Sequence, residues 1–261
     1  MAQEPRIVFT ESAEGVYPIN VDAVLLGAFL HALEAPKARR HAVDLGCGSG
    51  VIGLQLLAAC GFERVTFVDV HAGSVATAEA SARASGFAER AAYVTRDARA
   101  FAEEHRGVAN LVAINPPYFE AHTVTLSPSG DKNRAISGSL PLFLQAARQL
   151  LGRAGRVALA YPAARFDALL VEAVRAGLAP KVVRFVHGRA GEAARLTLVA
   201  FAAGKVGGMA TLEPLVEWEA AGGDAKIRPA MTREYEEILA RWRRWIDAPP
   251  VPAELVSPRR D

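Results

Sequence analysis

The sequence predicts an α/β fold in which a doubly wound, seven-stranded sheet is mostly parallel and has an antiparallel last strand. From residue 41 onward, short runs rich in β-branched and aromatic residues alternate with amphipathic stretches, which is typical of a parallel sheet wrapped by helices. Glycines stand where these helices should end, at Gly86, Gly152, Gly155 and Gly177. Of the 261 residues, 51% are apolar, which is enough to fill one main core.

The expected elements follow one another in a regular order. Strands are expected at His41–Leu45, Val65–Val70, Ala91–Thr95, Leu111–Ile114, Arg156–Ala160, Val182–Val186 and Leu196–Phe201. Helices are expected at Val51–Cys60, Ser74–Ser85, Ala98–Glu104, Leu140–Leu151, Ala164–Ala176 and Thr232–Ile246. Residues 188–194, between the last two strands, leave no room for a crossover helix. These two strands should therefore pair antiparallel.

Segments outside this alternation divide the chain further. Residues 1–38 are expected to form an N-terminal capping segment, in which Ala23–Leu30 is apolar enough for a buried helix. The main domain then spans residues 39–204, and residues 205–247 form an appendage packed on it. Residues 248–261 contain four prolines and are predicted to be a disordered tail.

The charge, the lengths of the apolar runs, and the cysteines and histidines limit which kinds of function the chain can have. The net charge of +2 is small, so it argues neither for nor against nucleic acid. No apolar run approaches the roughly 18 residues that a membrane helix needs, so no membrane partner is expected. Cys47 and Cys60 are poorly placed for a disulfide, which favours reduced thiols and a cytoplasmic location. The six histidines show no paired ligand spacing, and no metal is predicted.

The most distinctive loop follows the first strand, where an acid is succeeded by three glycines. Glycine has no Cβ, so backbone N–H groups and the N-terminus of the following helix can approach a ligand closely. This loop is therefore predicted to bind a ligand through Asp44, Gly46, Cys47, Gly48 and Gly50.

Two classes of ligand compete for this loop. Residues 48–53 match G-x-G-x-x-G, and Asp69 lies nineteen residues beyond Gly50, close to the spacing of a dinucleotide site. However, Asp44 would face a pyrophosphate, whereas S-adenosylmethionine (SAM) presents an ammonium and a sulfonium there. No Gly-Lys-Ser/Thr follows the glycines, which excludes a triphosphate loop. SAM is therefore the predicted cofactor, with S-adenosylhomocysteine as its product.

Three further acids are assigned to the cofactor site. Asp69 is expected to accept both ribose hydroxyls, because one carboxylate can take two O–H donors. Asp97 is expected to accept from the adenine amino group, or to cap the helix that begins at Ala98, and both roles could hold together. Asp22 precedes the apolar N-terminal helix, which is either a core helix or one that also covers a side of the ligand. On the second interpretation Asp22 belongs to the cofactor site.

The fourth strand runs directly into Asn115-Pro116-Pro117-Tyr118, the most informative motif in the chain. Prolines fix φ and lack N–H groups, so the turn presents carbonyl oxygens with few internal donors to occupy them. The side-chain oxygen of Asn115 and the carbonyl of Pro116 would accept the two hydrogens of an exocyclic –NH2 group. Tyr118, with Phe119, would stack on the planar ring that carries it. Asn115, Pro116 and Tyr118 are therefore the predicted catalytic residues, and Asn115 also borders the cofactor.

Basic residues indicate where a nucleic acid could bind. Lys132 and Arg134 lie closest in sequence to the Asn-Pro-Pro-Tyr motif and are the predicted phosphate contacts. Further clusters surround the last two strands and the C-terminal helix, where acids are interspersed with them. Each cluster is either an RNA contact or an ordinary solvated charged face.

Residues 16–240 resemble a class I SAM-dependent methyltransferase of the Asn-Pro-Pro-Tyr group, with a Rossmann-like fold. Within that group the chain is most similar to the bacterial tRNA (valine) adenine-N6-methyltransferases. The resemblance is carried by residues 21–29, 44–53, 115–119 and 214–216. It implies that the chain binds RNA and methylates adenine N6 in tRNA.

Two other substrates remain open. Enzymes that methylate a glutamine amide of peptide-release factors share the Asn-Pro-Pro-Tyr motif, but they usually carry a long helical N-terminal domain. Only about forty residues precede the first strand here. Methylation of a ribosomal RNA base is the other alternative.

Overall fold

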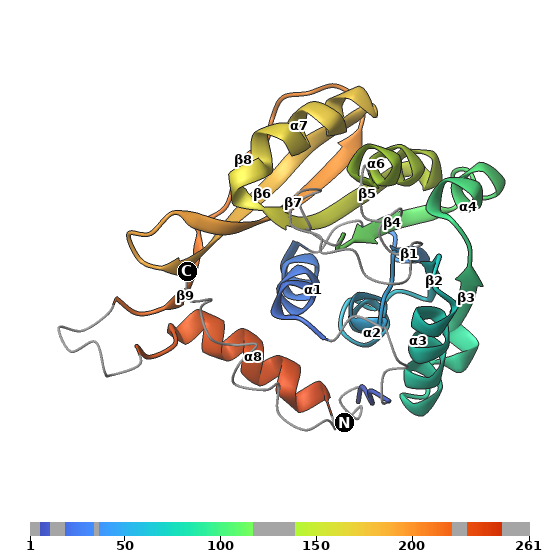
Figure 1. Ribbon diagram of the computed structural model, residues 1–261, viewed down its shortest axis with the longest axis horizontal. Coiled ribbons are helices and arrows are strands. Elements are labelled where there is room, and N and C mark those ends of the chain that lie inside the picture. The colour runs from blue at the N-terminus through green and yellow to red at the C-terminus, as the bar shows by residue number, and fades with distance from the viewer. Residues whose placement is uncertain (1–5, 11–18, 34–36, 117–138, 221–228, 247–261) are drawn as a thin grey trace, which may run out of the picture.

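The computed structural model describes residues 6–10, 19–33, 37–116, 139–220 and 229–246. One twisted sheet, flanked by helices on both faces, forms the body of the molecule (Figure 1). The strand order is β3-β2-β1-β4-β5-β7-β6-β8, with β9 also paired to β6.

The structure gives the elements the following bounds. The strands are β1 (His41–Leu45), β2 (Arg64–Asp69), β3 (Ala91–Thr95), β4 (Ala109–Ile114), β5 (Leu151–Pro162), β6 (Leu178–Arg189), β7 (Ala194–Ala203), β8 (Ala210–Thr211) and β9 (Leu215–Trp218). The α-helices are α1 (Val21–Leu33), α2 (Val51–Ala58), α3 (Ala72–Ala84), α4 (Ala98–Glu104), α6 (Ser139–Leu150), α7 (Phe166–Arg175) and α8 (Arg233–Trp245).

The predicted fold class is confirmed. Strands β3, β2, β1, β4 and β5 pair in parallel, and β7 pairs antiparallel with both β5 and β6. The strand order reverses between β1 and β4, and in doubly wound sheets ligands bind at such a switch point, beyond the carboxyl ends of the strands. Two short strands, β8 and β9, extend the sheet beyond the seven that the sequence predicts, each parallel to β6.

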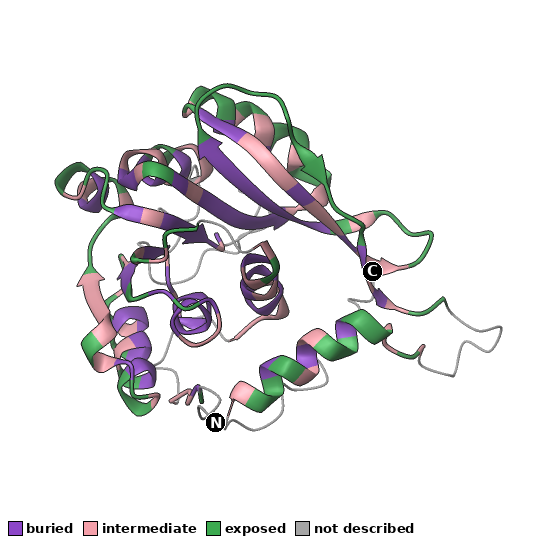
Figure 2. Ribbon diagram, turned by 180° about the vertical axis from the view of Figure 1, so that it is seen from behind, coloured by how far each residue is buried: buried purple, intermediate pink, exposed green. Residues whose placement is uncertain are grey.

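Alternate residues of the central strands face two separate hydrophobic clusters. In β1, Ala42 belongs to the cluster with α1, α2 and α8, whereas Val43 and Leu45 belong to the cluster with α6 and α7. Both faces of the sheet are therefore covered, which explains why its strands are apolar along their whole length. Figure 2 shows the resulting pattern, with buried residues on the central strands and exposed residues on the outer faces of the helices.

The start of β5 differs most from the expected bounds. The glycines of this segment predict a break before Arg156, but the strand already begins at Leu151, which pairs with Ala109 of β4. An irregularity in the register follows, and Ala154 adopts a left-handed backbone with φ 62°. A Cβ at Gly155 would lie 3.0 Å from the carbonyl oxygen of Ala109. These glycines therefore permit a close approach of two strands, as glycine does at bulges.

The last helix packs on the same cluster as the first. Tyr235, Leu239 and Trp242 of α8 are buried with residues of α1 and α2, and Figure 1 shows α1 between the sheet and α8. The N-terminal segment reaches the same region, because the Ile7 amide donates to the carbonyl of Trp245. Residues from both ends of the described chain therefore close one side of the core.

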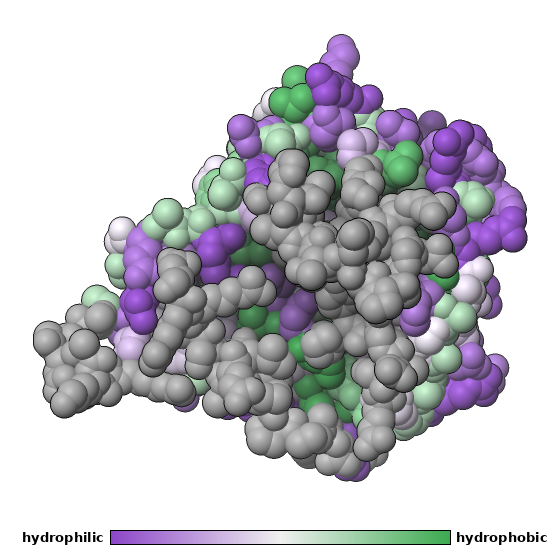
Figure 3. Space-filling view, viewed as in Figure 1, coloured by the Kyte–Doolittle hydropathy of each residue, from purple (hydrophilic) through white to green (hydrophobic). Residues whose placement is uncertain are grey.

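Figure 3 shows hydrophilic side chains along much of the outer rim of one face and hydrophobic side chains nearer its middle. No helix within the described ranges is long and apolar enough to cross a membrane. Cys47 and Cys60 are both buried and free.

Candidate functional site

The glycine loop connects β1 to α2 at the carboxyl edge of the sheet. Gly46, Gly48 and Gly50 have φ angles of 77°, 51° and 81°, a left-handed backbone that residues with a side chain rarely adopt. The amides of Gly46 and Cys47 donate to the carbonyl of Val68 in β2, at 2.8 and 3.0 Å. A Cβ at Gly48 would meet nothing within 4 Å. The loop is therefore anchored to β2 and leaves open space beside Gly48, where a ligand could lie against the backbone.

Asp44 lies under this loop and is almost completely buried, with a relative exposure of 1%. Its Oδ2 accepts a hydrogen bond from the Gly53 amide in the first turn of α2, at 2.8 Å. Burial raises the pKa of Asp44 to about 8, the Gly53 amide opposes this shift, and the charge of Asp69 adds to it. A positive group nearby would stabilise the carboxylate, so the site suits a cation rather than a phosphate.

Asp69 ends β2 and lies beside the glycine loop. Its Oδ2 accepts from the Gly48 amide at 3.0 Å, and its Oδ1 accepts from the His71 amide at 2.9 Å. A carboxylate oxygen has two lone pairs, so each can accept a further hydrogen bond. Asp69 thus joins the loop after β1 to the loop after β2.

Asp97 follows β3 and is exposed. Its Oδ1 accepts from the amides of Arg99 and Ala100, at 2.9 and 3.2 Å. The helix-cap role that the sequence predicts for Asp97 is therefore confirmed, whereas contact with adenine stays a prediction.

Cys47, in the glycine loop, is also buried, and burial raises the pKa of its thiol. Its backbone amide holds it in the loop by donating to the carbonyl of Val68.

Asn115 and Pro116 come directly after β4, next to β1 at the switch point. Asn115 is half-buried and Pro116 is buried. The Nδ2 of Asn115 donates to the Oδ1 of Asn20, just before α1, at 3.3 Å. The structure thus brings the start of α1 against the predicted catalytic turn. Tyr118, Phe119, Lys132 and Arg134 lie outside the described residues.

Asp22 of α1 takes part in an ion cluster with Arg195 of β7 and Glu217 of β9. Arg195 Nη1 donates to Asp22 Oδ1 at 2.8 Å, and its other guanidinium nitrogens donate to both carboxylate oxygens of Glu217. Burial lowers the pKa of Arg195, but the two carboxylates outweigh it and raise that pKa overall. These contacts of Asp22 tie α1 to the sheet, and its contact with the cofactor stays a prediction.

Sequence reasoning missed Asn20. An asparagine three residues before the first buried residue of a helix is a recognisable cap signal, and its Oδ1 does accept from the Ala23 amide, at 2.9 Å. No local pattern, however, indicates that the same side chain contacts Asn115, 95 residues away.

Several basic residues of the cluster around the last two long strands, β6 and β7, have partners within the protein. Arg184 pairs with Glu234 at 2.6 Å, and Arg189 pairs with Glu192 at 3.3 Å. Lys181 donates to the carbonyls of Lys205 and Gly207. These contacts favour the charged-face interpretation for this cluster.

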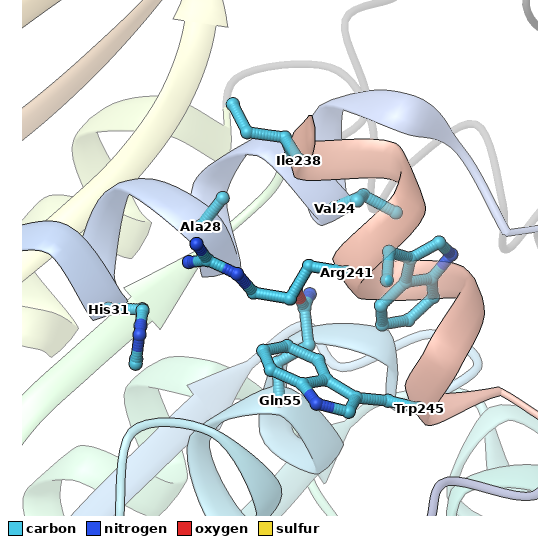
Figure 4. Close-up of a pocket in the computed structure, with 8 residues that line it drawn as sticks. Val24, Ala28, His31, Gln55, Ile238, Arg241 and Trp245 are labelled. Carbon is cyan, nitrogen blue, oxygen red and sulfur yellow. The ribbon is translucent and has the colours of Figure 1, made fainter. Parts of the chain in front are cut away.

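A small cavity lies between α1, α2 and α8 (Figure 4). Its volume of about 10 Å³ suits one water molecule, and its lining includes His31, Arg241 and Trp245. None of its lining residues comes from the carboxyl ends of the strands, so it is distinct from the site around Asp44. Within the described ranges, no group of three or more His, Cys, Asp or Glu residues is arranged to hold a metal.

Comparisons with known proteins agree with this geometry. Residues 19–131 match the methyltransferase small domain family. A tRNA1(Val) (adenine(37)-N6)-methyltransferase from Phocaeicola vulgatus is 30% identical over 189 residues, which cover 70% of this chain and 76% of that protein. A protein of the same name from Yersinia pestis is 32% identical over 148 residues, covering 55% of this chain and 57% of that protein.

A solved structure supports the fold. A protein described as a predicted O-methyltransferase from Agrobacterium tumefaciens superposes with a TM-score of 0.59, at 20% identity. The match covers 83% of this chain and 94% of that one. At this identity the likeness extends to the fold alone.

Proposed function

Because the chain belongs to the family of the tRNA1(Val) (adenine(37)-N6)-methyltransferases, we propose that it transfers a methyl group from SAM to adenine N6 in tRNA. The observation that carries this proposal is the juxtaposition of Asn115 and Pro116 with the Asp44 glycine loop, at the switch point between β1 and β4. The loop that would bind the cofactor therefore lies beside the residues that would accept the amino hydrogens.

The residues present fit SAM. The buried Asp44 favours a cation, and the space beside Gly48 admits a ligand close to the backbone. Asp44 and the loop residues Gly46, Cys47, Gly48 and Gly50 would hold the amino-acid end, and Asp69 would hold the ribose hydroxyls. Asp97 would accept from the adenine amino group, and Asp22 would border the site from α1. When bound, SAM supplies an electrophilic methyl group.

The catalytic work of the chain is then mainly positioning. The side-chain oxygen of Asn115 and the carbonyl of Pro116 accept the two hydrogens of the target amino group. These two hydrogen bonds would orient the nitrogen lone pair for attack on the methyl group that SAM supplies, and would disperse the positive charge that develops on nitrogen. No strong base would be needed, because the amino proton becomes acidic only after the new bond forms and can then be lost to solvent.

The target base must leave its stack to reach this turn. Tyr118 and Phe119 would stack on it, at about 1–3 kcal/mol per base, which offsets much of the unstacking free energy. Lys132 and Arg134 would contact phosphates of the RNA. A tRNA substrate would fit a cytoplasmic location.

Methyl-labelled SAM tests the substrate. The chain is incubated with labelled SAM and, separately, with total tRNA, ribosomal RNA and a peptide-release factor. We expect label in tRNA, recovered as N6-methyladenosine after digestion to nucleosides. Label only in the release factor, or only in ribosomal RNA, would overturn the assignment of tRNA.

Asn115→Ala tests the mechanism. We expect kcat to fall by about 10²–10³, as when one preorganised hydrogen-bonding group is removed, while calorimetry still detects SAM binding. A variant that binds SAM normally and keeps wild-type turnover would refute the role of Asn115.

A further inference from the structure

Asn20 makes two contacts through a single oxygen atom. Its Oδ1 accepts from the Ala23 amide at 2.9 Å, and so caps the first turn of α1. The same Oδ1 accepts from the Nδ2 of Asn115 at 3.3 Å. The cap of α1 is therefore also a neighbour of the predicted catalytic side chain.

These contacts determine how the carboxamide of Asn115 is oriented. A backbone N–H can only donate, so the atom of Asn20 that faces Ala23 must be its oxygen. Because that oxygen also faces Asn115, the nearest atom of Asn115 must be a donor, which is Nδ2. The Oδ1 of Asn115 consequently lies on the branch of the side chain that is turned away from Asn20.

We propose that Asn20 is a positioning residue, which holds the Asn115 carboxamide with its oxygen toward the amino group of the substrate. This inference rests on the proposed function. A carboxamide rotated by 180° would present –NH2 to the substrate –NH2, and two donors cannot bond to each other. By holding one orientation, Asn20 removes this unproductive state before the substrate arrives.

The position of Asn20 is itself fixed by the sheet. Asp22, two residues further on, accepts from Arg195 of β7 at 2.8 Å, and Arg195 also pairs with Glu217. The start of α1 is therefore held by an ion cluster on two strands. A functional side chain is positioned precisely when its supporting residues sit on such rigid elements.

Three variants separate positioning from helix capping. Asn20→Ser keeps a good cap for α1, but its hydroxyl is one bond shorter and can rotate, so it no longer fixes Asn115. Asn20→Asp keeps an oxygen that faces both donors. Thr232→Ala is the matched control, because the Thr232 side chain caps α8 by accepting from the Tyr235 amide, in a different part of the fold.

We expect Asn20→Ser to lower kcat by about tenfold, with the KM for tRNA and the Kd for SAM within about twofold of wild type. Asn20→Asp should recover most of this loss. Thr232→Ala should lower the thermal midpoint without changing kcat. Wild-type kcat in Asn20→Ser, or an equal loss of kcat in Asn20→Ser and Asn20→Asp, would overturn the inference.

A second measurement needs no turnover. The side-chain ¹⁵N–¹H₂ signals of Asn115, identified by their loss in Asn115→Asp, report the two amide protons separately. We expect both protons to exchange slowly with solvent in the wild type and in Asn20→Asp, and the proton that Asn115 donates to Asn20 to change its chemical shift and to exchange faster in Asn20→Ser. Unchanged signals in Asn20→Ser would refute the positioning role. If the wild type methylates no RNA while the signals behave as expected, only the proposed function fails.

Discussion

Gly48 and Gly53 lie five residues apart, but a methyl group would have different neighbours at the two positions. At Gly53 a Cβ would lie 2.2 Å from Cε1 of Phe67, because α2 packs tightly on β2. We therefore expect Gly53→Ala to lower the free energy of unfolding by about 2 kcal/mol through overpacking, with SAM affinity altered little in the folded fraction. Urea unfolding and calorimetry measure the two effects.

Gly48→Ala is the matched variant and should behave in the opposite way. Its left-handed backbone costs only about 1 kcal/mol of stability, but its Cβ would enter the open space that we propose for the cofactor. We expect SAM affinity to fall by at least about tenfold. Unimpaired SAM binding by Gly48→Ala would place the cofactor elsewhere.

We expect Asp44 to make SAM binding depend on pH. Its pKa is about 8 in the ligand-free protein, and a bound cation would lower it, so binding below pH 8 must displace a proton. We expect SAM affinity to rise by up to about tenfold per pH unit from pH 6 to 8 and then to level off. Titration calorimetry in buffers of different ionisation enthalpy should detect the released proton.

The same carboxyl affects the stability of the ligand-free chain in a defined direction. Between its ordinary pKa of 3.8 and about 8, the folded protein holds a proton that the unfolded chain has released. The protonated Asp44 carboxyl therefore makes its full contribution to the stability of the folded protein at low pH, and this contribution is lost as the pH rises toward 8. Asp44→Asn removes the titration, so its unfolding free energy should depend less on pH and its SAM affinity should not change across this range.

At the scale of elements, one ion cluster joins a helix and two strands. Arg195 lies between Asp22 and Glu217, and only 6% of the Glu217 side chain is exposed. Arg195→Met would leave two carboxylates without their cation, and we expect it to lower the free energy of unfolding by about 3 kcal/mol, the lower end for a buried pair. The lower end applies because 35% of the Arg195 side chain remains exposed.

An exposed pair provides the control for this urea-unfolding measurement. Arg233 and Glu237 pair on α8, with 92% and 60% of their side chains exposed. Arg233→Met should change the free energy of unfolding by less than about 0.5 kcal/mol. Similar small effects for Arg195→Met and Arg233→Met would show that the Arg195 cluster does not hold α1 in place.

At the scale of the whole molecule, α8 completes a core shared with α1 and α2. Trp242 is 2% exposed, and the centroid of its ring lies 5.7 Å from the centroid of the Phe9 ring. Trp242→Ala should lower the free energy of unfolding by about 3–5 kcal/mol. Because this core is shared, we expect circular dichroism and tryptophan fluorescence to report one coincident transition in the wild type.

A smaller change at this position isolates the indole N–H group. Within the described residues, the buried Nε1 of Trp242 has no hydrogen-bond partner. Trp242→Phe removes that unpaired donor together with some packing, so its cost should stay well below that of Trp242→Ala. An early, separate transition for α8 would instead show that it is an independent unit.

Much of the fold could be predicted because it is encoded locally. The bounds of β1, β3 and α4 match the expected ranges, since β-rich runs and the Asp97 cap mark them directly. The start of β5 could not be predicted, because its glycines usually break a strand. Here they let that strand approach β4 closely.

The sequence by itself identified the glycine loop, the acids Asp44, Asp69 and Asp97 at the ends of the first three strands, and the Asn115-Pro116 pair after the fourth. Each is a short pattern whose chemistry is complete within a few residues. Only the tertiary structure decided that Asn20 faces Asn115 and that Arg195 joins Asp22 to Glu217. These partners are 22 to 173 residues apart, and their pairing depends on how α1 and β9 dock on the sheet, which no local periodicity specifies.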